Sequence, residues 1–65
     1  RANLTKRQEK IVRYLHDYGL IQNKDFEKVF PKISEDTVLR DLKKLIKKDI
    51  IEKKGRTKAS RYVLK

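Results

Sequence analysis

The spacing of apolar residues changes at Ile50, and this change limits the folds that are available to the chain. Before Ile50, apolar residues recur every three or four positions, which is the spacing of amphipathic helices. From Ile50 onward, two short segments with strand-like patterns flank a turn that contains Gly55. The pattern therefore predicts an α+β domain in which three helices precede a two-stranded β-hairpin.

The first predicted helix covers Leu4–Tyr18 and has signals for both of its ends. Thr5 and Gln8 have the spacing of a capping box, in which each side chain satisfies a free backbone donor of the other residue. Gly19 follows at the position where a left-handed residue commonly ends a helix. The three tyrosines are expected in the core or at its edge, with their hydroxyls in water: Tyr14, Tyr18 and Tyr62.

Two further helices are predicted on either side of Pro31. The shorter one covers Lys24–Phe30, with Asn23 as its N-cap, and ends there because a residue that precedes proline disfavours helical geometry. The longer one covers about Glu35–Lys48, with Ser34 as its N-cap. Acidic residues in its first turn and lysines in its last turn both suit the helix dipole.

The predicted hairpin completes the chain. Its strands are Ile50–Lys54 and Ala59–Leu64, and the turn between them is Gly55–Lys58. Glycine at the start of this turn can adopt the positive φ that tight turns require.

The composition excludes several classes of function. With 65 residues, the chain is expected to form one domain over residues 1–65, and its start at Arg1 suggests a piece of a longer protein. It has no cysteine and only one histidine, His16, so disulfides and thiolate metal sites are excluded. It has no apolar run long enough to span a membrane. No residue set resembles a catalytic centre, so we expect a non-enzymatic domain. We also expect the domain to be monomeric and cytoplasmic and to have no cofactor.

Positive charge is concentrated in the last part of the chain. Arg40–Lys65 contains eleven basic and three acidic residues, which gives +8 of the total formal charge of +10. The first 39 residues contribute only +2. Such an uneven field is typical of a surface that binds a polyanion, and the alternative is a solvated face that keeps the protein soluble.

The stretch Ser34–Leu45 resembles the recognition helix of DeoR-type bacterial regulators, which follows the pattern S-x-x-T-x-x-R-D-L-x-x-L. The segments after it resemble the wing and closing strand of a winged helix-turn-helix domain, so the resemblance covers essentially all 65 residues. Related modules occur at the C-termini of larger prokaryotic proteins. Two departures are visible: Asp49 stands where family members usually have glycine, and the turn Phe30–Ile33 is about one residue longer than usual.

The resemblance implies a set of DNA contacts. In a helix-turn-helix, the second helix of the motif enters the major groove, and its N-terminal half meets base edges. This places Thr37 and Arg40 toward bases, and Arg40 could donate two hydrogen bonds to a guanine. The wing would flank the duplex, with Arg56 at its tip suited to a narrow minor groove. The remaining predicted contacts, mainly to phosphates, are Lys43, Lys44, Lys47, Lys54, Lys58 and Arg61.

Each of these residues also has a structural interpretation. Arg40 could form an ion pair with Asp36 or Asp41, and the lysines could simply cover a solvated helix face. Basic residues on a hairpin can also prevent association of strand edges. Asp41 is expected to have a structural role, paired with Lys44, Lys48 or a basic residue of the wing. Glu35 and Asp36 would repel phosphates. We interpret them as acidic residues that complement the helix dipole. The alternative is that one of them accepts a hydrogen bond from N4 of cytosine.

The main hypothesis is therefore binding of double-stranded DNA by a transcription regulator or a DNA-targeting module close to the nucleoid. A protein-interaction module that docks on an acidic partner is the alternative. Binding of RNA or of a left-handed duplex ranks lower, because left-handed-duplex readers of similar fold present Asn and Tyr on the third helix and Trp in the wing. The chain has no Trp, and its third helix has no Tyr.

Overall fold

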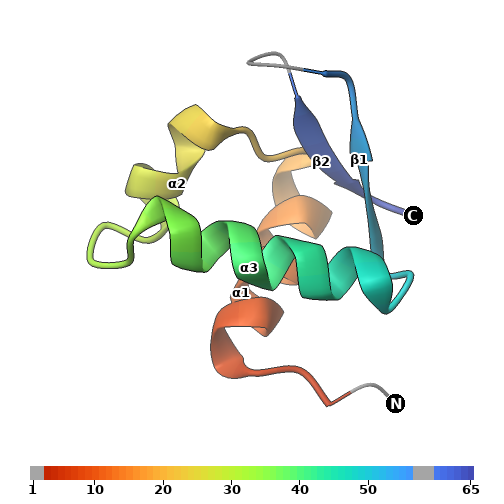
Figure 1. The fold of residues 1–65 in the computed structure, drawn as a ribbon, viewed down its shortest axis with the longest axis horizontal. Helices are drawn as coiled ribbons and strands as arrows, with labels where there is room; N and C mark the ends of the chain where they lie inside the picture. Colours follow the sequence, from red (N-terminus) through yellow and green to blue (C-terminus); the bar gives the residue numbers. More distant parts are fainter. Residues whose placement is uncertain (1–2, 57–59) are drawn as a thin grey trace.

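A computed structural model describes residues 3–56 and 60–65 of the chain. Within this part, the helices are α1 (Lys6–Tyr18), α2 (Asn23–Val29) and α3 (Glu35–Lys47), followed by the strands β1 (Ile51–Lys54) and β2 (Arg61–Leu64). Figure 1 shows α3 lying across the front of the molecule, with α1 and α2 behind it and the hairpin beside its C-terminal end. The predicted winged helix-turn-helix arrangement of three helices and a two-stranded hairpin is confirmed.

The helices begin close to the predicted positions, because local capping groups fix them. Thr5 is the N-cap of α1 and forms the predicted capping box with Gln8, so the helix starts at Lys6 rather than at Leu4. Gly19 ends it with a φ of 90°. Ser34 is the N-cap of α3, as predicted.

The start and end of α2 differ from the prediction by one residue. Asn23 is the first residue of the helix and not its cap, and the N-cap is Gln22. The backbone N–H of Gln22 donates to Asp25 Oδ2 at 2.9 Å, which stabilises this earlier start. The helix ends at Val29, because Phe30 has left helical geometry, with φ −131° and ψ 73°, immediately before Pro31.

The core lies where the helices and the hairpin meet. Its fully buried side chains come from every part of the fold and are Ile11, Leu15, Ile21, Val38, Leu42, Leu45 and Ile51. Tyr62 is also buried, as predicted, and Tyr14 packs at the edge of the core. Tyr18 was expected at the core or its edge, and this was wrong: it is 71% exposed, and its ring lies against that of Tyr14 at 4.6 Å between centroids.

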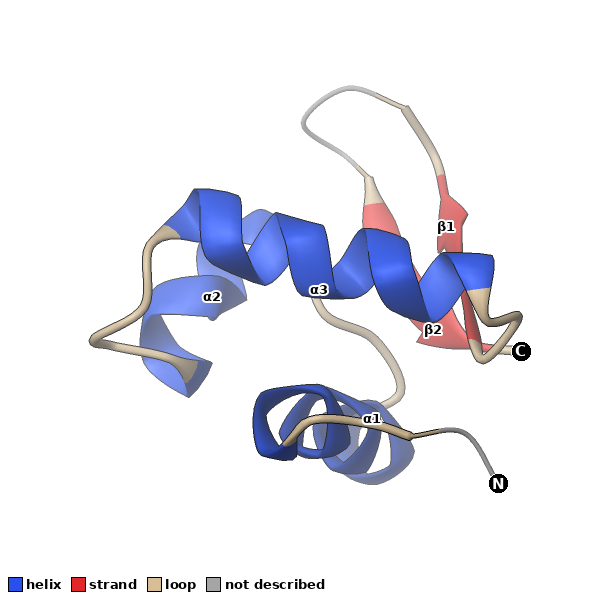
Figure 2. Ribbon diagram, turned by 60° about the horizontal axis from the view of Figure 1, so that its bottom comes forward, coloured by secondary structure: helices blue, strands red, loops and turns tan. Residues whose placement is uncertain are grey.

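The hairpin is antiparallel and shorter than predicted. Ile51 pairs with Leu64, and Lys54 pairs with Arg61. Ile21 extends this small sheet through a bridge to Tyr62, in which their backbone groups exchange hydrogen bonds of 3.0 and 2.9 Å. Figure 2 shows the hairpin rising beside α3 on the side away from the start of α1. Thr57–Ala59, which includes parts of the predicted turn and return strand, lies outside the described residues.

Asp49, the unusual residue after α3, adopts a left-handed conformation with a φ of 66°. This geometry turns the chain back, so that the N–H of Ile50 donates to the carbonyl of Leu45 at 3.0 Å. Lys65 Nζ contacts the Asp49 carboxylate, and this contact raises the pKa of the Lys65 ammonium group above its usual range. The backbone at Asp49 therefore has the left-handed geometry that glycine adopts most readily and that aspartate tolerates better than most residues.

Candidate nucleic-acid interface

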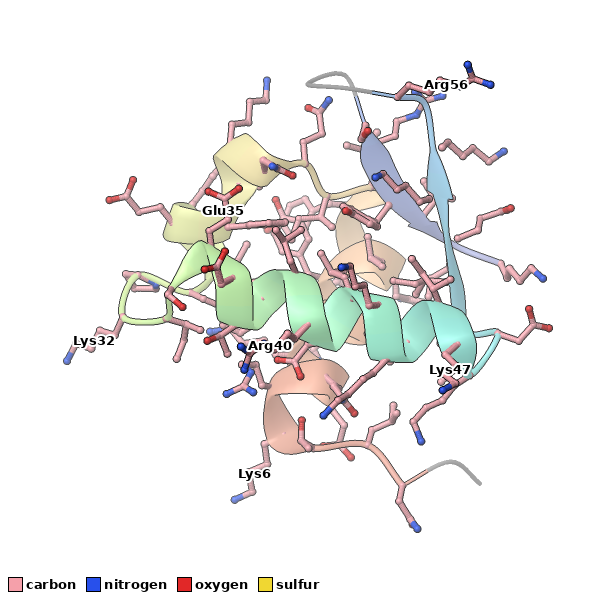
Figure 3. The ribbon with its side chains drawn as sticks, viewed as in Figure 1. Lys6, Lys32, Glu35, Arg40, Lys47 and Arg56 are labelled. Atoms are coloured by element: carbon pink, nitrogen blue, oxygen red, sulfur yellow. The ribbon has the colours of Figure 1, made fainter. Side chains whose placement is uncertain are left out.

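One face of α3 is covered by basic side chains, while the opposite face forms part of the core. Val38, Leu42 and Leu45 are fully buried on the inner side. The outer side carries exposed basic residues three or four positions apart, which places them on one face of the helix: Arg40, Lys43, Lys44 and Lys47. Figure 3 shows Arg40 on the edge of α3 that faces the first turn of α1, and Lys47 near the C-terminal end. From Arg40 to Lys47 the helix therefore presents a basic surface, which the exposed Asp36 precedes on the same face.

Arg40 and Thr37 differ in the contacts that their side chains form within the domain. Arg40 is exposed, and it forms no ion pair within the part of the chain that the structure describes, so its predicted alternative partners, Asp36 and Asp41, do not hold it. Thr37 is half-buried, and its hydroxyl lies 2.9 Å from that of Ser34. Arg40 is thus available for an external ligand, whereas Thr37 takes part in the cap of α3.

The acidic start of α3 is turned partly toward α2. The side-chain amide of Asn23 donates to Glu35 Oε2 at 3.0 Å. Figure 3 shows Glu35 on the side of α3 that faces α2, away from Arg40. Both Glu35 and Asp36 lie in the first turn, where a carboxylate is favoured by the helix dipole. The negative charge of Glu35 is therefore directed away from the basic surface.

A second basic group lies on the hairpin. The register places Lys54 of β1 directly opposite Arg61 of β2, so both side chains lie on the same face of the ribbon. Both are exposed. Lys53 faces the other side, opposite Tyr62. The exposed Arg56 follows Gly55, which has a φ of 85°, and Figure 3 shows it at the far end of the hairpin. Lys58 lies outside the described residues.

Asp41 has partners that the sequence did not suggest. It is only 3% exposed, and its carboxylate contacts Arg7 and Gln8 of α1. The expected pairing with Lys44, Lys48 or the wing was therefore wrong, although a structural role is confirmed. The hydrogen bond from Arg7 to Asp41 is the main reason that the pKa of the Arg7 guanidinium is raised above its ordinary value.

Many exposed cations lie outside the predicted set of contacts, Lys6 and Lys32 among them. Figure 3 shows Lys6 projecting from the first turn of α1 and Lys32 projecting from the turn before α3. Both are exposed. For Lys6, the sequence suggests a solvated face, with a phosphate contact as the alternative. Lys32 lies in a turn, and a single lysine there gives no sequence signal that separates a phosphate contact from a solvated charge.

Metal binding and membrane insertion find no support in the described residues. No group of three His, Cys, Asp or Glu side chains in residues 3–56 and 60–65 could hold a metal ion. No helix within the same ranges is long and apolar enough to cross a membrane. The exposed chemistry of this part of the chain is dominated by Lys and Arg.

Comparison with known protein families shows which family the chain belongs to. Residues 7–58 match the model of the DeoR-like helix-turn-helix domain. The chain belongs to this family. The matched range runs from α1 into the hairpin and includes α2 and α3, which form the helix-turn-helix. No match was found among curated proteins or among solved structures.

Membership in the family establishes the general function. DeoR-like helix-turn-helix domains bind DNA as parts of transcription regulators and have no catalytic activity. The predictions of a DNA-binding, non-enzymatic domain are therefore confirmed at this level. The individual residues that contact DNA, and the groove that each element enters, are the subject of the proposal that follows.

Proposed function

We propose that the DeoR-like domain binds double-stranded DNA with α3 in the major groove and with the wing along the adjacent backbone or minor groove. The observation that carries this proposal is the basic outer face of α3, opposite its buried inner face. A helix of this kind fits the major groove, where its polar face meets base edges and phosphates. The proposal also places the domain in the cytoplasm, at the nucleoid.

Arg40 is the proposed base-reading residue. It is exposed, it has no ion-pair partner among the described residues, and it is the basic residue nearest the N-terminal end of the basic face. Its guanidinium can donate two hydrogen bonds to O6 and N7 of guanine, an interaction that discriminates between bases by about 1–3 kcal/mol. Thr37, one turn earlier, would meet a phosphate or a thymine methyl group.

The lysines of α3 and the wing residues are proposed as phosphate contacts. Lys43, Lys44 and Lys47 lie on the same face as Arg40 and would bind the backbone on either side of the groove. On the wing, Lys54 and Arg61 form a pair of like charges, which is unfavourable in the free protein. A phosphate between them would relieve this repulsion, and Arg56 would extend the contact at the far end of the hairpin. Lys58 is proposed as a further phosphate contact from the sequence alone.

The experiment compares Arg40→Ala with Arg13→Ala, which removes the same side chain from the exposed part of α1. A duplex selected by the parent chain from a random library and a shuffled version of it are the probes. Arg40→Ala should bring the two affinities together, with a loss of about 1–3 kcal/mol on the selected duplex. Arg13→Ala should keep the preference. If the Arg40 variant distinguishes the duplexes as well as the parent does, the base-reading role is excluded.

The salt dependence separates this function from docking on an acidic protein. With roughly five to eight phosphate contacts, log K should fall with log salt at a slope of about −5 to −7. If the domain instead docks on an acidic protein, duplex DNA added at low salt should cause no measurable shift that reports binding. A duplex RNA competitor of the same length tests the RNA alternative, and it should compete poorly if α3 requires the wide major groove of B-form DNA.

A further inference from the structure

We propose that Arg7, Gln8 and Asp41 act together as a positioning unit that fixes the direction in which α3 presents Arg40. The inference rests on the proposed function, because it assigns to these residues a role in sequence preference and not only in folding. None of them is proposed to touch a base. Their effect would be transmitted through the orientation of α3 relative to α1.

Asp41 is the centre of this unit. Its carboxylate is almost completely buried, with a side-chain exposure of 4%. One oxygen, Oδ2, accepts from Nε of Arg7, and the other, Oδ1, accepts from the side-chain amide of Gln8 at 3.3 Å. Both side-chain hydrogen bonds between α1 and α3 in the described chain therefore end on Asp41.

Gln8 connects this contact to the start of α1. Its Oε1 accepts from the backbone N–H of Thr5 at 3.2 Å, while its Nε2 donates to Asp41. Its own backbone N–H donates to the hydroxyl of Thr5 at 3.1 Å. Because the oxygen of the amide is used by the cap, the nitrogen must face α3. The two ends of the Gln8 amide thus link the first turn of α1 directly to the middle of α3.

The rest of the contact between α1 and α3 fixes the angle between the two helices less strictly. It is formed by apolar residues such as Ile11 and Leu42, and apolar burial is favourable without being directional. Hydrogen bonds lose strength steeply when their geometry is distorted. Asp41 is the neighbour of Arg40 in sequence, so a rotation or shift that breaks the bonds of Asp41 would also displace Arg40. The unit also keeps the charge of Asp41 away from the basic face.

The decisive variant is Asp41→Asn, together with a compensating second change. Asparagine can still accept from Arg7, but its amide nitrogen would then face that of Gln8, so two donors would oppose each other. Adding Gln8→Glu restores an acceptor opposite that amide and keeps a capping box with Thr5. The double variant Gln8→Glu/Asp41→Asn has the same net charge as the parent.

The measurement is the ratio of affinities for the selected duplex and its shuffled version, at several salt concentrations, with the 65-residue chain. We expect Asp41→Asn to lower the ratio about tenfold and the double variant to restore it to within about threefold of the parent. The slope of log K against log salt should stay unchanged in both variants, because no phosphate contact is removed. An unchanged ratio in folded Asp41→Asn would overturn the inference, and so would a double variant that regains stability but not the ratio.

Arg7→Lys provides a second test if Asp41→Asn fails to fold. It keeps the charge and loses the Nε donor, so the ratio should fall while the salt slope stays the same. An unchanged ratio would overturn the inference. Arg7→Met tests the competing explanation that Arg7, whose side chain is 37% exposed, itself binds a phosphate. That explanation requires a slope smaller by about 0.9, whereas a positioning role requires no change. A parent chain that selects no sequence would instead refute the base-reading function itself.

Discussion

The two basic elements of this DeoR-like domain are held in place by very different amounts of structure. α3 has 13 residues, a serine cap and three fully buried side chains, and Asp41 fixes it to α1. The hairpin has strands of four residues each, with one buried side chain in β1 and one in β2. Contacts to base edges read the sequence, whereas phosphate contacts position the protein on the duplex and carry no sequence information directly. The difference supports the proposal that α3 carries the sequence preference, while the wing adds phosphate contacts to those of the α3 lysines.

The largest expected effect comes from weakening the inner face of α3. Leu42 is fully buried, and Leu42→Ala should lower the free energy of unfolding by about 2–5 kcal/mol, through lost burial and the cavity left behind. The matched change in the wing is Leu64→Ala, which removes a half-buried side chain and should cost roughly half as much or less. Urea denaturation followed by circular dichroism measures both. Equal losses would show that the wing is held as firmly as α3.

An intermediate effect is expected at the cap of α3. The hydroxyl of Ser34 accepts from the N–H of Thr37 at 3.3 Å, so Ser34→Ala should destabilise the fold by about 1 kcal/mol. Ser34→Gly is the control, because glycine is itself a favourable N-cap residue and should cost only a few tenths of a kcal/mol at position 34. Thermal unfolding of the two variants tests this order. Equal melting temperatures would show that the cap contributes little.

A smaller effect of opposite sign is expected in the wing. Lys54→Thr removes one of two opposed like charges, so the free protein should become more stable by about 0.2–1 kcal/mol. DNA binding should weaken on all sequences alike, with the salt slope reduced by about 0.9. Lys53→Thr is the control, because Lys53 lies opposite Tyr62 and should show neither effect. If Lys53→Thr changes the salt slope as much as Lys54→Thr does, the face of the hairpin that carries Lys54 and Arg61 is not the face that contacts DNA.

The smallest expected effect appears only at alkaline pH. Burial raises the pKa of the Tyr62 hydroxyl above its ordinary value of 10.0. The folded state therefore keeps this proton at a pH where the unfolded chain loses it, so stability is complete below about pH 10 and decreases as the pH rises further. Tyr62→Phe should therefore lose less stability than the parent as the pH rises above about 10. Parallel pH curves for the two proteins would mean that Tyr62 does not contribute to this loss.

The elements that the sequence predicted correctly depend on neighbours close in the chain. The Thr5–Gln8 capping box, Gly19 and Ser34 act within a few residues, so their spacing alone located the ends of α1 and the start of α3. The basic face of α3 follows in the same way from helical spacing. These local signals are sufficient for the fold class and for one of the two basic surfaces.

The features that were missed depend on contacts between distant residues. Arg7 and Asp41 are 34 positions apart, and no local pattern pairs them in preference to Asp41 and Lys44. Tyr18 continues the apolar spacing of α1 but lies beyond the core, where Ile21 is fully buried instead. The pairing of Lys54 with Arg61 depends on the register of the hairpin, which the sequence of its turn does not specify uniquely.

The most direct test of the account is an NMR titration of the isotope-labelled chain with a short duplex at low salt. The account predicts that the largest amide shifts occur along the outer face of α3 and in the wing, around Arg40, Lys44, Lys54 and Arg61. The second half of α1, including Arg13, should change little. Shifts centred on that part of α1, with α3 unaffected, would contradict the placement of α3 in the DNA groove.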